Sequence, residues 1–199
     1  KNQIPVVALV GYTNAGKSSL MNYFASNYGT DKNDVFEKNM LFATLDTKAK
    51  RIYKDNYPPF ILIDTIGFIS KLPTELISSF ESTLEDIATA DLIIHVVDGK
   101  NPTELQINLT KNLLTQMGVI NVPRIMVVTK SDIRVNPPLL VDDYIYISNK
   151  TGEGMDQLYQ AIDSHLYPDS RIYILSIPFE KGNIYQELKD HTRVLETTY

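Results

Sequence analysis

The sequence of 199 residues contains no cysteine. The chain therefore forms no disulfide, and it has no thiolate for catalysis or metal binding. Its three histidines, His95, His165 and His191, are far apart and form no metal-ligand cluster in the sequence. No apolar run approaches the roughly 20 residues that cross a membrane, and residues 1–5 do not resemble a signal peptide. We therefore expect a cytoplasmic protein without a membrane span.

Basic residues are outnumbered by acidic ones, because 19 Lys and Arg stand against 24 Asp and Glu, which gives a net charge of −5. This balance argues against a large basic surface, so we expect no DNA partner and only local contact with RNA. The length suits one α/β domain with a small appendage. Because the chain opens at Lys1, five residues before its first apolar run, we expect it to be a piece of a longer protein.

A phosphate-binding loop follows the first apolar run, residues 6–10. Gly11 and Gly16 allow backbone N–H groups to converge on phosphate oxygens, Lys17 can reach the β- and γ-phosphates, and Ser18 can ligate magnesium. A glycine turn with an incidental lysine is the alternative, and the strand before and helix after the loop disfavour it. The pattern G-x-x-x-x-G-K-[ST] is matched by Gly11, Tyr12, Thr13, Asn14, Ala15, Gly16, Lys17 and Ser18, with Ser19 next in the helix.

Strand-like and helix-like segments alternate along the chain. Such alternation predicts βαβ units with right-handed crossovers. We expect an α/β fold of the P-loop NTPase class, with a mostly parallel six-stranded sheet between helices on both faces. The expected strands are residues 6–10, 49–53, 60–63, 92–98, 124–128 and 144–147, and the expected helices leave the phosphate loop and cover about 73–90, 101–117 and 155–166.

A second candidate site follows the third strand, at Asp64, Thr65, Ile66 and Gly67. A carboxylate at the carboxyl edge of a parallel strand can hold magnesium through water, and a glycine N–H there can contact a γ-phosphate. The acidic residues of the 73–90 helix are instead expected on a solvated helix face. His95 lies within an apolar run, and we interpret it as a hydrogen-bonded core histidine.

Five motifs in this order resemble the guanine-nucleotide-binding domain of translation-factor-like GTPases, and more narrowly the HflX family of ribosome-associated GTPases. The likeness covers about residues 4–167, and residues 177–182 are similar to the beginning of that family's C-terminal region. The motifs are the phosphate loop; Leu41, Phe42, Ala43, Thr44, Leu45 and Asp46; Asp64 to Phe68; Thr129, Lys130, Ser131 and Asp132; and Ser148, Asn149 and Lys150 with Thr151 to Gly154.

The resemblance implies a GTPase that binds GTP, GDP and Mg²⁺ and acts as a switch on the large (50S) ribosomal subunit, in ribosome dissociation or rescue. It divides the chain into a GTP-binding domain, residues 1–167, and the start of a small, incomplete C-terminal module, residues 168–199. In that module we expect a strand at 171–177 and a helix at 183–191.

The resemblance also assigns roles to single residues. Thr44 would be the second magnesium ligand and close over the γ-phosphate, with Thr47 as the alternative. Asp132 would accept hydrogen bonds from the guanine N1 and 2-amino groups, the Lys130 stem would lie along the base, and backbone N–H groups of 148–150 would meet O6. Thr129 departs from the usual asparagine, and one hydroxyl cannot reproduce both arms of an amide.

Phe68 stands where small GTPases often have a glutamine that orients the attacking water. We therefore expect slow intrinsic hydrolysis, stimulated by a partner or a monovalent cation. Asn14 could help to hold K⁺ beside the phosphates, or it could only tolerate the loop geometry. Lys17, Asn14, Thr44 and Gly67 are thus the candidate catalytic residues. Two alternative functions are a nucleotide-dependent binding module with negligible hydrolysis and an ATP or GTP hydrolase unrelated to ribosomes.

Overall fold

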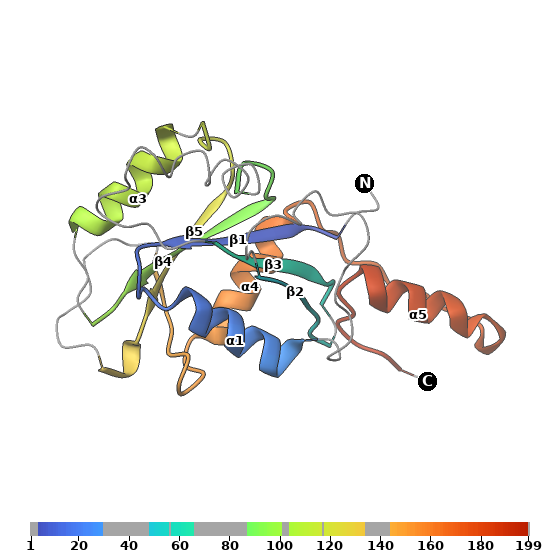
Figure 1. Ribbon diagram of the computed structural model, residues 1–199. Helices are drawn as coiled ribbons and strands as arrows, with labels where there is room; N and C mark the ends of the chain where they lie inside the picture. Colours follow the sequence, from blue (N-terminus) through green and yellow to red (C-terminus); the bar gives the residue numbers. More distant parts are fainter. Residues whose placement is uncertain are drawn as a thin grey trace.

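The fold is seen in a computed structural model, which describes residues 4–29, 48–55, 57–65, 87–100, 104–116, 118–133 and 144–198. Six strands form one sheet in the order β2-β3-β1-β4-β5-β6, in which only β2 is antiparallel to its neighbour (Figure 1). The predicted α/β fold is confirmed. The strands are β1 (Val6–Gly11), β2 (Lys48–Ile52), β3 (Phe60–Asp64), β4 (Leu92–Asp98), β5 (Arg124–Thr129) and β6 (Tyr144–Tyr146).

The strand register brings the carboxyl ends of the parallel strands to one edge of the sheet. Leu9 of β1 pairs with Asp64 at the end of β3, and Asp98 at the end of β4 pairs with Thr129 at the end of β5. The segments that follow these strands therefore lie close together although up to about a hundred residues separate them in the sequence. This is the edge at which open parallel sheets bind their ligands.

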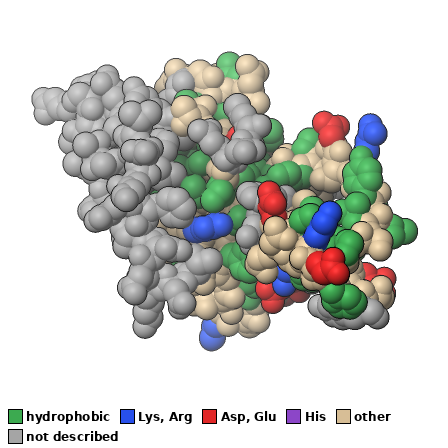
Figure 2. Space-filling model, turned by 90° about the vertical axis from the view of Figure 1, so that its right-hand side faces the viewer, with side chains coloured by type: hydrophobic (Ala, Val, Ile, Leu, Met, Phe, Trp, Pro, Cys, Tyr) green, Lys and Arg blue, Asp and Glu red, His purple; other side chains and the backbone are tan. Residues whose placement is uncertain are grey.

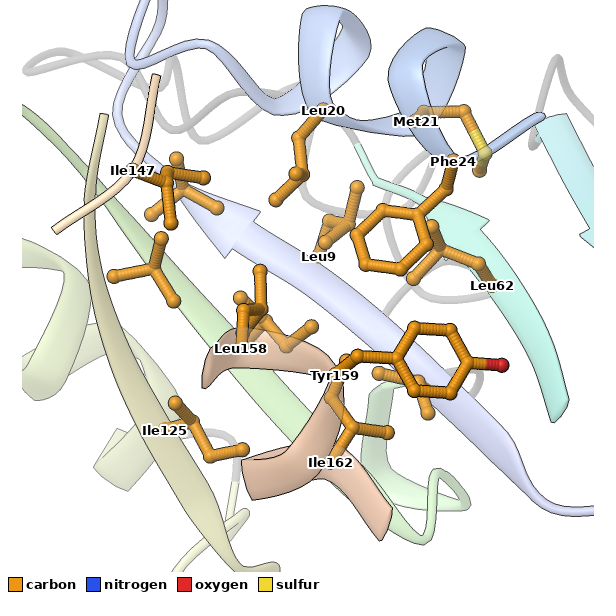
Figure 3. Packing of buried hydrophobic residues seen from close by; sticks show 14 of the residues in the cluster. Leu9, Leu20, Met21, Phe24, Leu62, Ile125, Ile147, Leu158, Tyr159 and Ile162 are labelled. Carbon is orange, nitrogen blue, oxygen red and sulfur yellow. The ribbon is translucent and has the colours of Figure 1, made fainter. Parts of the chain in front are cut away.

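Helices cover both faces of the sheet, as predicted. On one face, α1 (Lys17–Tyr28) and α4 (Met155–Leu166) bury Leu20, Phe24, Leu158 and Tyr159 against β1 and its neighbours. Figure 3 shows the rings of Phe24 and Tyr159 next to each other, with the strand residue Leu9 beside the Phe24 ring. On the other face, α3 (Glu104–Gln116) buries Leu114 in a second cluster with β-strand side chains. The sheet is thus buried on both sides, which explains its continuous apolar strands.

Two predicted segments lie largely outside the described residues. They are the loop that carries Thr44 and Thr47 and the helix expected over 73–90. Only the end of this helix, residues 87–90, is described, and Ile87 there is buried. The strand expected at 49–53 is present one residue earlier, as β2.

The strand predicted at 171–177 is wrong. These residues belong to no strand, and Ile172, Tyr173 and Ile174 are at least 72% exposed. A β-branched, apolar sequence forms a strand only where a second strand supplies hydrogen bonds. The expected helix is present as α5 (Gly182–His191), which projects beside the C-terminus in Figure 1. Figure 2 views this end of the molecule and shows hydrophobic side chains interspersed with charged ones.

Candidate nucleotide-binding site

The phosphate loop has the backbone that the glycine pattern requires. Gly11 has a φ of +150°, and a Cβ there would lie 2.2 Å from the Val96 carbonyl oxygen. Gly16 has a φ of +100° and immediately precedes α1. The first N–H groups of an α-helix have no partner within the helix, so they favour an anion at this point. The loop thus offers a phosphate site at the positive end of α1.

Lys17 is held inside the loop by two backbone carbonyl groups. Its Nζ donates to the carbonyl oxygens of Gly11 and Tyr12, each at 3.0 Å, and the residue is only 6% exposed. Burial lowers the pKa of Lys17, while the nearby Asp64 carboxylate acts in the opposite direction. The ammonium of Lys17 is therefore placed where it can donate charge-assisted hydrogen bonds to phosphate oxygens.

Ser18 and Asp64 meet at the sheet edge, as the sequence predicts. The Ser18 hydroxyl donates to Oδ2 of Asp64 over 2.7 Å. The second oxygen of this carboxylate, Oδ1, is buried and has no hydrogen-bond partner. A hydroxyl and a carboxylate with a free buried oxygen are hard oxygen donors of the kind that Mg²⁺ prefers, so these two residues fit a magnesium ion.

Thr129 and Lys130 connect the predicted base site to the phosphate loop. The Thr129 hydroxyl lies 2.7 Å from the Ala15 carbonyl oxygen, and the side chain is fully buried. Lys130 donates to the carbonyl oxygen of Asn14 at 3.2 Å and to Asp98 at 2.7 Å. Sequence reasoning missed Asp98, although its position at the end of β4 could have signalled it.

Asp132 and Ser148 come together as the motif order predicts. The Ser148 hydroxyl donates to Oδ1 of Asp132 at 2.8 Å and accepts from the backbone N–H groups of Lys150 and Thr151. Ser148 thus orients the carboxylate and shapes the loop that carries the backbone donors. Glu153 also supports this loop, by accepting a hydrogen bond from Ser131 at 2.9 Å.

Several predicted site residues lie outside the described part of the chain, so their roles stay predictions. They are Phe42, Ala43, Thr44, Leu45, Asp46, Ile66, Gly67 and Phe68. Asn14 is described, with a left-handed φ of +61°. Its carbonyl oxygen accepts a hydrogen bond from Lys130, which agrees with the loop-geometry alternative and leaves the potassium role as a prediction.

His95 is a core residue, but the prediction that it is hydrogen-bonded is wrong at Nδ1. The side chain is 1% exposed, and its Nδ1 has no partner. Burial, together with Lys111, Arg124 and Lys17, lowers the pKa of His95 to about 3, so the ring is neutral near pH 7. Among the described residues, no three His, Asp or Glu side chains gather to hold a metal, and no helix is long and apolar enough to span a membrane.

Comparison with known proteins identifies relatives of this chain. It is 40% identical over 200 residues to the GTPase HflX of Caldanaerobacter subterraneus subsp. tengcongensis and 35% identical over 205 residues to the GTPase HflX of Lacrimispora saccharolytica. Both alignments cover 100% of this chain but only 45% and 47% of the relatives, so the chain spans about half of their length. The resemblance to the HflX family is confirmed.

A solved structure with a similar fold is a GTP-binding protein from Sulfolobus solfataricus in complex with GDP. Its TM-score is 0.63 at 24% identity, over 83% of this chain and 53% of that one. At this identity the likeness shows the fold alone. The family model described as "50S ribosome-binding GTPase" matches residues 6–130, from β1 through Lys130. Because this match covers more than half of the chain, the protein belongs to the 50S ribosome-binding GTPase family.

Proposed function

We propose that the protein binds and hydrolyses GTP and acts as a nucleotide-dependent switch on the large ribosomal subunit. One observation carries the proposal. Lys17, the Ser18–Asp64 pair and the Asp132–Ser148 pair lie at the same edge of the sheet. The groups that would bind the phosphates, the magnesium ion and the base therefore lie within reach of one bound nucleotide.

In this proposal the first turn of α1 and Lys17 bind the phosphates through N–H groups and one ammonium. Ser18 and Asp64 would hold Mg²⁺, with Thr44 as a further ligand, and the ion would neutralise phosphate charge. Asp132 accepts from the guanine N1 and 2-amino groups. Adenine lacks both donors and would leave the carboxylate without its base partners, which favours GTP over ATP.

Hydrolysis by the chain alone is expected to be slow, because Phe68 cannot hydrogen-bond the attacking water. Gly67 would contact the γ-phosphate, and Asn14 would help to bind K⁺. Rates measured in potassium and in sodium buffer test the potassium role, and equal rates would refute it.

Ribosome binding is supported by the description of the matched family and by the HflX relatives. Dissociation or rescue of ribosomes, in the cytoplasm, is the outcome that we propose. Residues 1–167 would be the GTP-binding domain, and residues 168–199 would begin a second module. The net charge of −5 makes this segment a poor source of RNA-binding charge, so segments outside residues 1–199 would supply it.

The decisive experiment measures GTP and ATP turnover in potassium buffer, with and without purified ribosomes, for the natural chain and for Asp132→Ala. We expect ribosome-stimulated GTP turnover that the variant loses. GTP binding without stimulated turnover would favour a nucleotide-dependent binding module, and equal ATP turnover would favour an unrelated hydrolase.

A further inference from the structure

Two strained points of the backbone are in contact at the phosphate loop. Among the residues that the structure describes, only Asn14 and Lys130 have a left-handed backbone without being glycine, with φ values of +61° and +59°. Although 116 residues separate them in the sequence, the Lys130 ammonium donates to the Asn14 carbonyl oxygen at 3.2 Å. A left-handed backbone costs free energy at a residue with a side chain, so it persists only where neighbouring groups impose it. The groups around this contact therefore determine the shape of the loop.

Asn14 is the third residue of a turn within the phosphate loop. The backbone N–H of Ala15 closes this turn by donating to the carbonyl oxygen of Tyr12 at 3.2 Å. A positive φ at the third residue of a turn suits glycine or asparagine. The peptide group between Asn14 and Ala15 is thus held at both ends, at its N–H by Tyr12 and at its carbonyl oxygen by Lys130. The chain continues directly into Gly16 and the first turn of α1.

Asp98, at the end of β4, fixes the position of the Lys130 ammonium. Its Oδ2 accepts a hydrogen bond from Lys130 Nζ at 2.7 Å, which is shorter than the contact of the same ammonium with the loop. The other oxygen, Oδ1, accepts from the backbone N–H of Lys100 at 2.9 Å and so orients the carboxylate. The Asp98 side chain is only 20% exposed, which limits screening of its charge by solvent. The carboxylate therefore has two contacts that can be removed separately, one to the backbone and one to the cation.

We propose that Asp98 is a positioning residue of the nucleotide site. It holds the Lys130 ammonium against the Asn14 carbonyl oxygen and thereby fixes the turn of the phosphate loop. Without the carboxylate, the ammonium would lose its charged partner and move toward solvent, and the turn would lose the donor at Asn14. A loop that must be ordered when its ligand binds gives a lower affinity. This inference rests on the proposed function, because it presupposes that the loop binds a nucleotide.

The test compares GDP affinities, by calorimetric titration with magnesium, of the natural chain, Asp98→Asn and Asp98→Ala. Asparagine keeps a carbonyl oxygen for the N–H of Lys100 and loses the charge that holds Lys130, whereas alanine loses both contacts. We expect both variants to bind GDP about tenfold more weakly than the natural chain and to differ from each other by less than about threefold. An unchanged affinity in Asp98→Asn would overturn the inference, since Asp98 would then act only by supporting the backbone at residue 100. Urea unfolding checks that each variant is folded, and Asp98→Asn alone decides the outcome if Asp98→Ala is not.

A double-mutant cycle with Lys130→Met tests whether Asp98 acts through the cation. Methionine keeps most of the aliphatic chain and removes the ammonium. Once residue 130 is methionine, Asp98→Asn should weaken GDP binding by less than about twofold further, because the group that it positions is gone. A further loss of about tenfold would mean that Asp98 acts independently of Lys130 and would overturn the inference.

Asp163→Asn is the matched control. Asp163 is also a largely buried carboxylate with one cationic partner, Arg193 at 3.3 Å, but it lies in the last turn of α4, away from the phosphate loop. This variant should change GDP affinity by less than about twofold. Equal losses in Asp163→Asn and Asp98→Asn would indicate a general effect of removing an ion pair and would overturn the inference. Failure of the natural chain to bind GDP would instead refute the proposed function.

Discussion

The two ends of the sheet are stabilised in different ways. At the carboxyl edge of the parallel strands, side chains hydrogen-bond to the phosphate-loop backbone, and one oxygen of Asp64 is left buried without a partner. At the opposite end, beside the β2–β3 turn, the ammonium of Lys54 lies within 5.4 Å of three ring centroids. We call Lys54 and the three rings, Tyr28, Tyr57 and Tyr159, the tyrosine cluster.

The tyrosine cluster joins segments that are far apart in the sequence. Tyr28 ends α1, Tyr57 lies in the turn before β3, and Tyr159 lies on α4. Arg193 of the C-terminal segment stacks 4.4 Å from the centroid of the Tyr57 ring and pairs with Asp163 at 3.3 Å. This end is therefore held by burial and stacking, which provide stability, whereas the carboxyl edge, where we propose the nucleotide site, holds polar groups and the buried cation of Lys17. The comparison predicts that variants at the two ends have separable effects on stability and on binding.

The largest effect on stability is expected for Tyr159→Ala. The side chain is 2% exposed and packs on Phe24, Phe60 and Tyr57, with centroid distances of 6.0, 5.6 and 4.9 Å. Its loss should lower the free energy of unfolding by about 3 to 5 kcal/mol, with GDP affinity changed less than about twofold. Urea unfolding and GDP titration measure the two quantities. The control Tyr159→Phe removes only a buried hydroxyl without a partner and should be neutral or stabilising. Equal losses in both variants would contradict the packing account.

The matching variant at the carboxyl edge is Lys17→Ala. It removes the buried cation that, in the proposed function, would contact the phosphates, so GDP affinity should fall by about 100-fold or more. Thermal stability should change little, because relief from burying the charge offsets the loss of the two hydrogen bonds to backbone carbonyls. Nucleotide titration and thermal unfolding of the same preparation measure both. A large loss of stability would show that Lys17 maintains the fold as well as the site.

His95, on the sheet near the phosphate loop, should make stability depend on pH. Its pKa is about 3 in the folded chain, below the ordinary 6.5, so the unfolded chain binds more protons between these values. The free energy of unfolding should therefore fall as pH decreases through this window, by up to about 1.4 kcal/mol per pH unit. His95→Leu removes the titration, and urea unfolding from about pH 6.5 to 4.5 should give it the shallower slope. Identical slopes would refute this assignment.

The smallest effect is expected at Lys54. Lys54→Met keeps the aliphatic stem but loses the cation beside the rings, and it should cost about 1 kcal/mol. Asp156→Asn is the control, since the Asp156 side chain is 82% exposed and its ion pair is worth less than about 0.5 kcal/mol. Unfolding at low and high salt compares the two variants. A larger loss of stability in Asp156→Asn than in Lys54→Met would show that the ion pair, and not the contact with the rings, provides the stabilisation.

The parts of the site that could be predicted from the sequence are contiguous. The phosphate loop and its strand and helix follow from one contiguous stretch, residues 6–24, because local backbone requirements fix the residue types. The contacts of Thr129, Lys130 and Asn149 with the phosphate loop could not be predicted, since their partners there are backbone carbonyls, which have no sequence signature, up to 133 residues away. The strand predicted at 171–177 fails for a related reason, because pairing depends on a partner that local sequence does not contain.

We propose that the polar end of the sheet is a guanine-nucleotide site. Calorimetric titration of GDP and of ADP, with magnesium, into the natural chain and into Asp132→Ala tests it most directly. We predict that GDP binds at least about 100-fold more tightly than ADP and that the variant loses most of this preference, because the carboxylate that receives the two guanine donors is gone. Equal affinities for GDP and ADP in the natural chain, or an unchanged preference in the variant, would contradict the assignment.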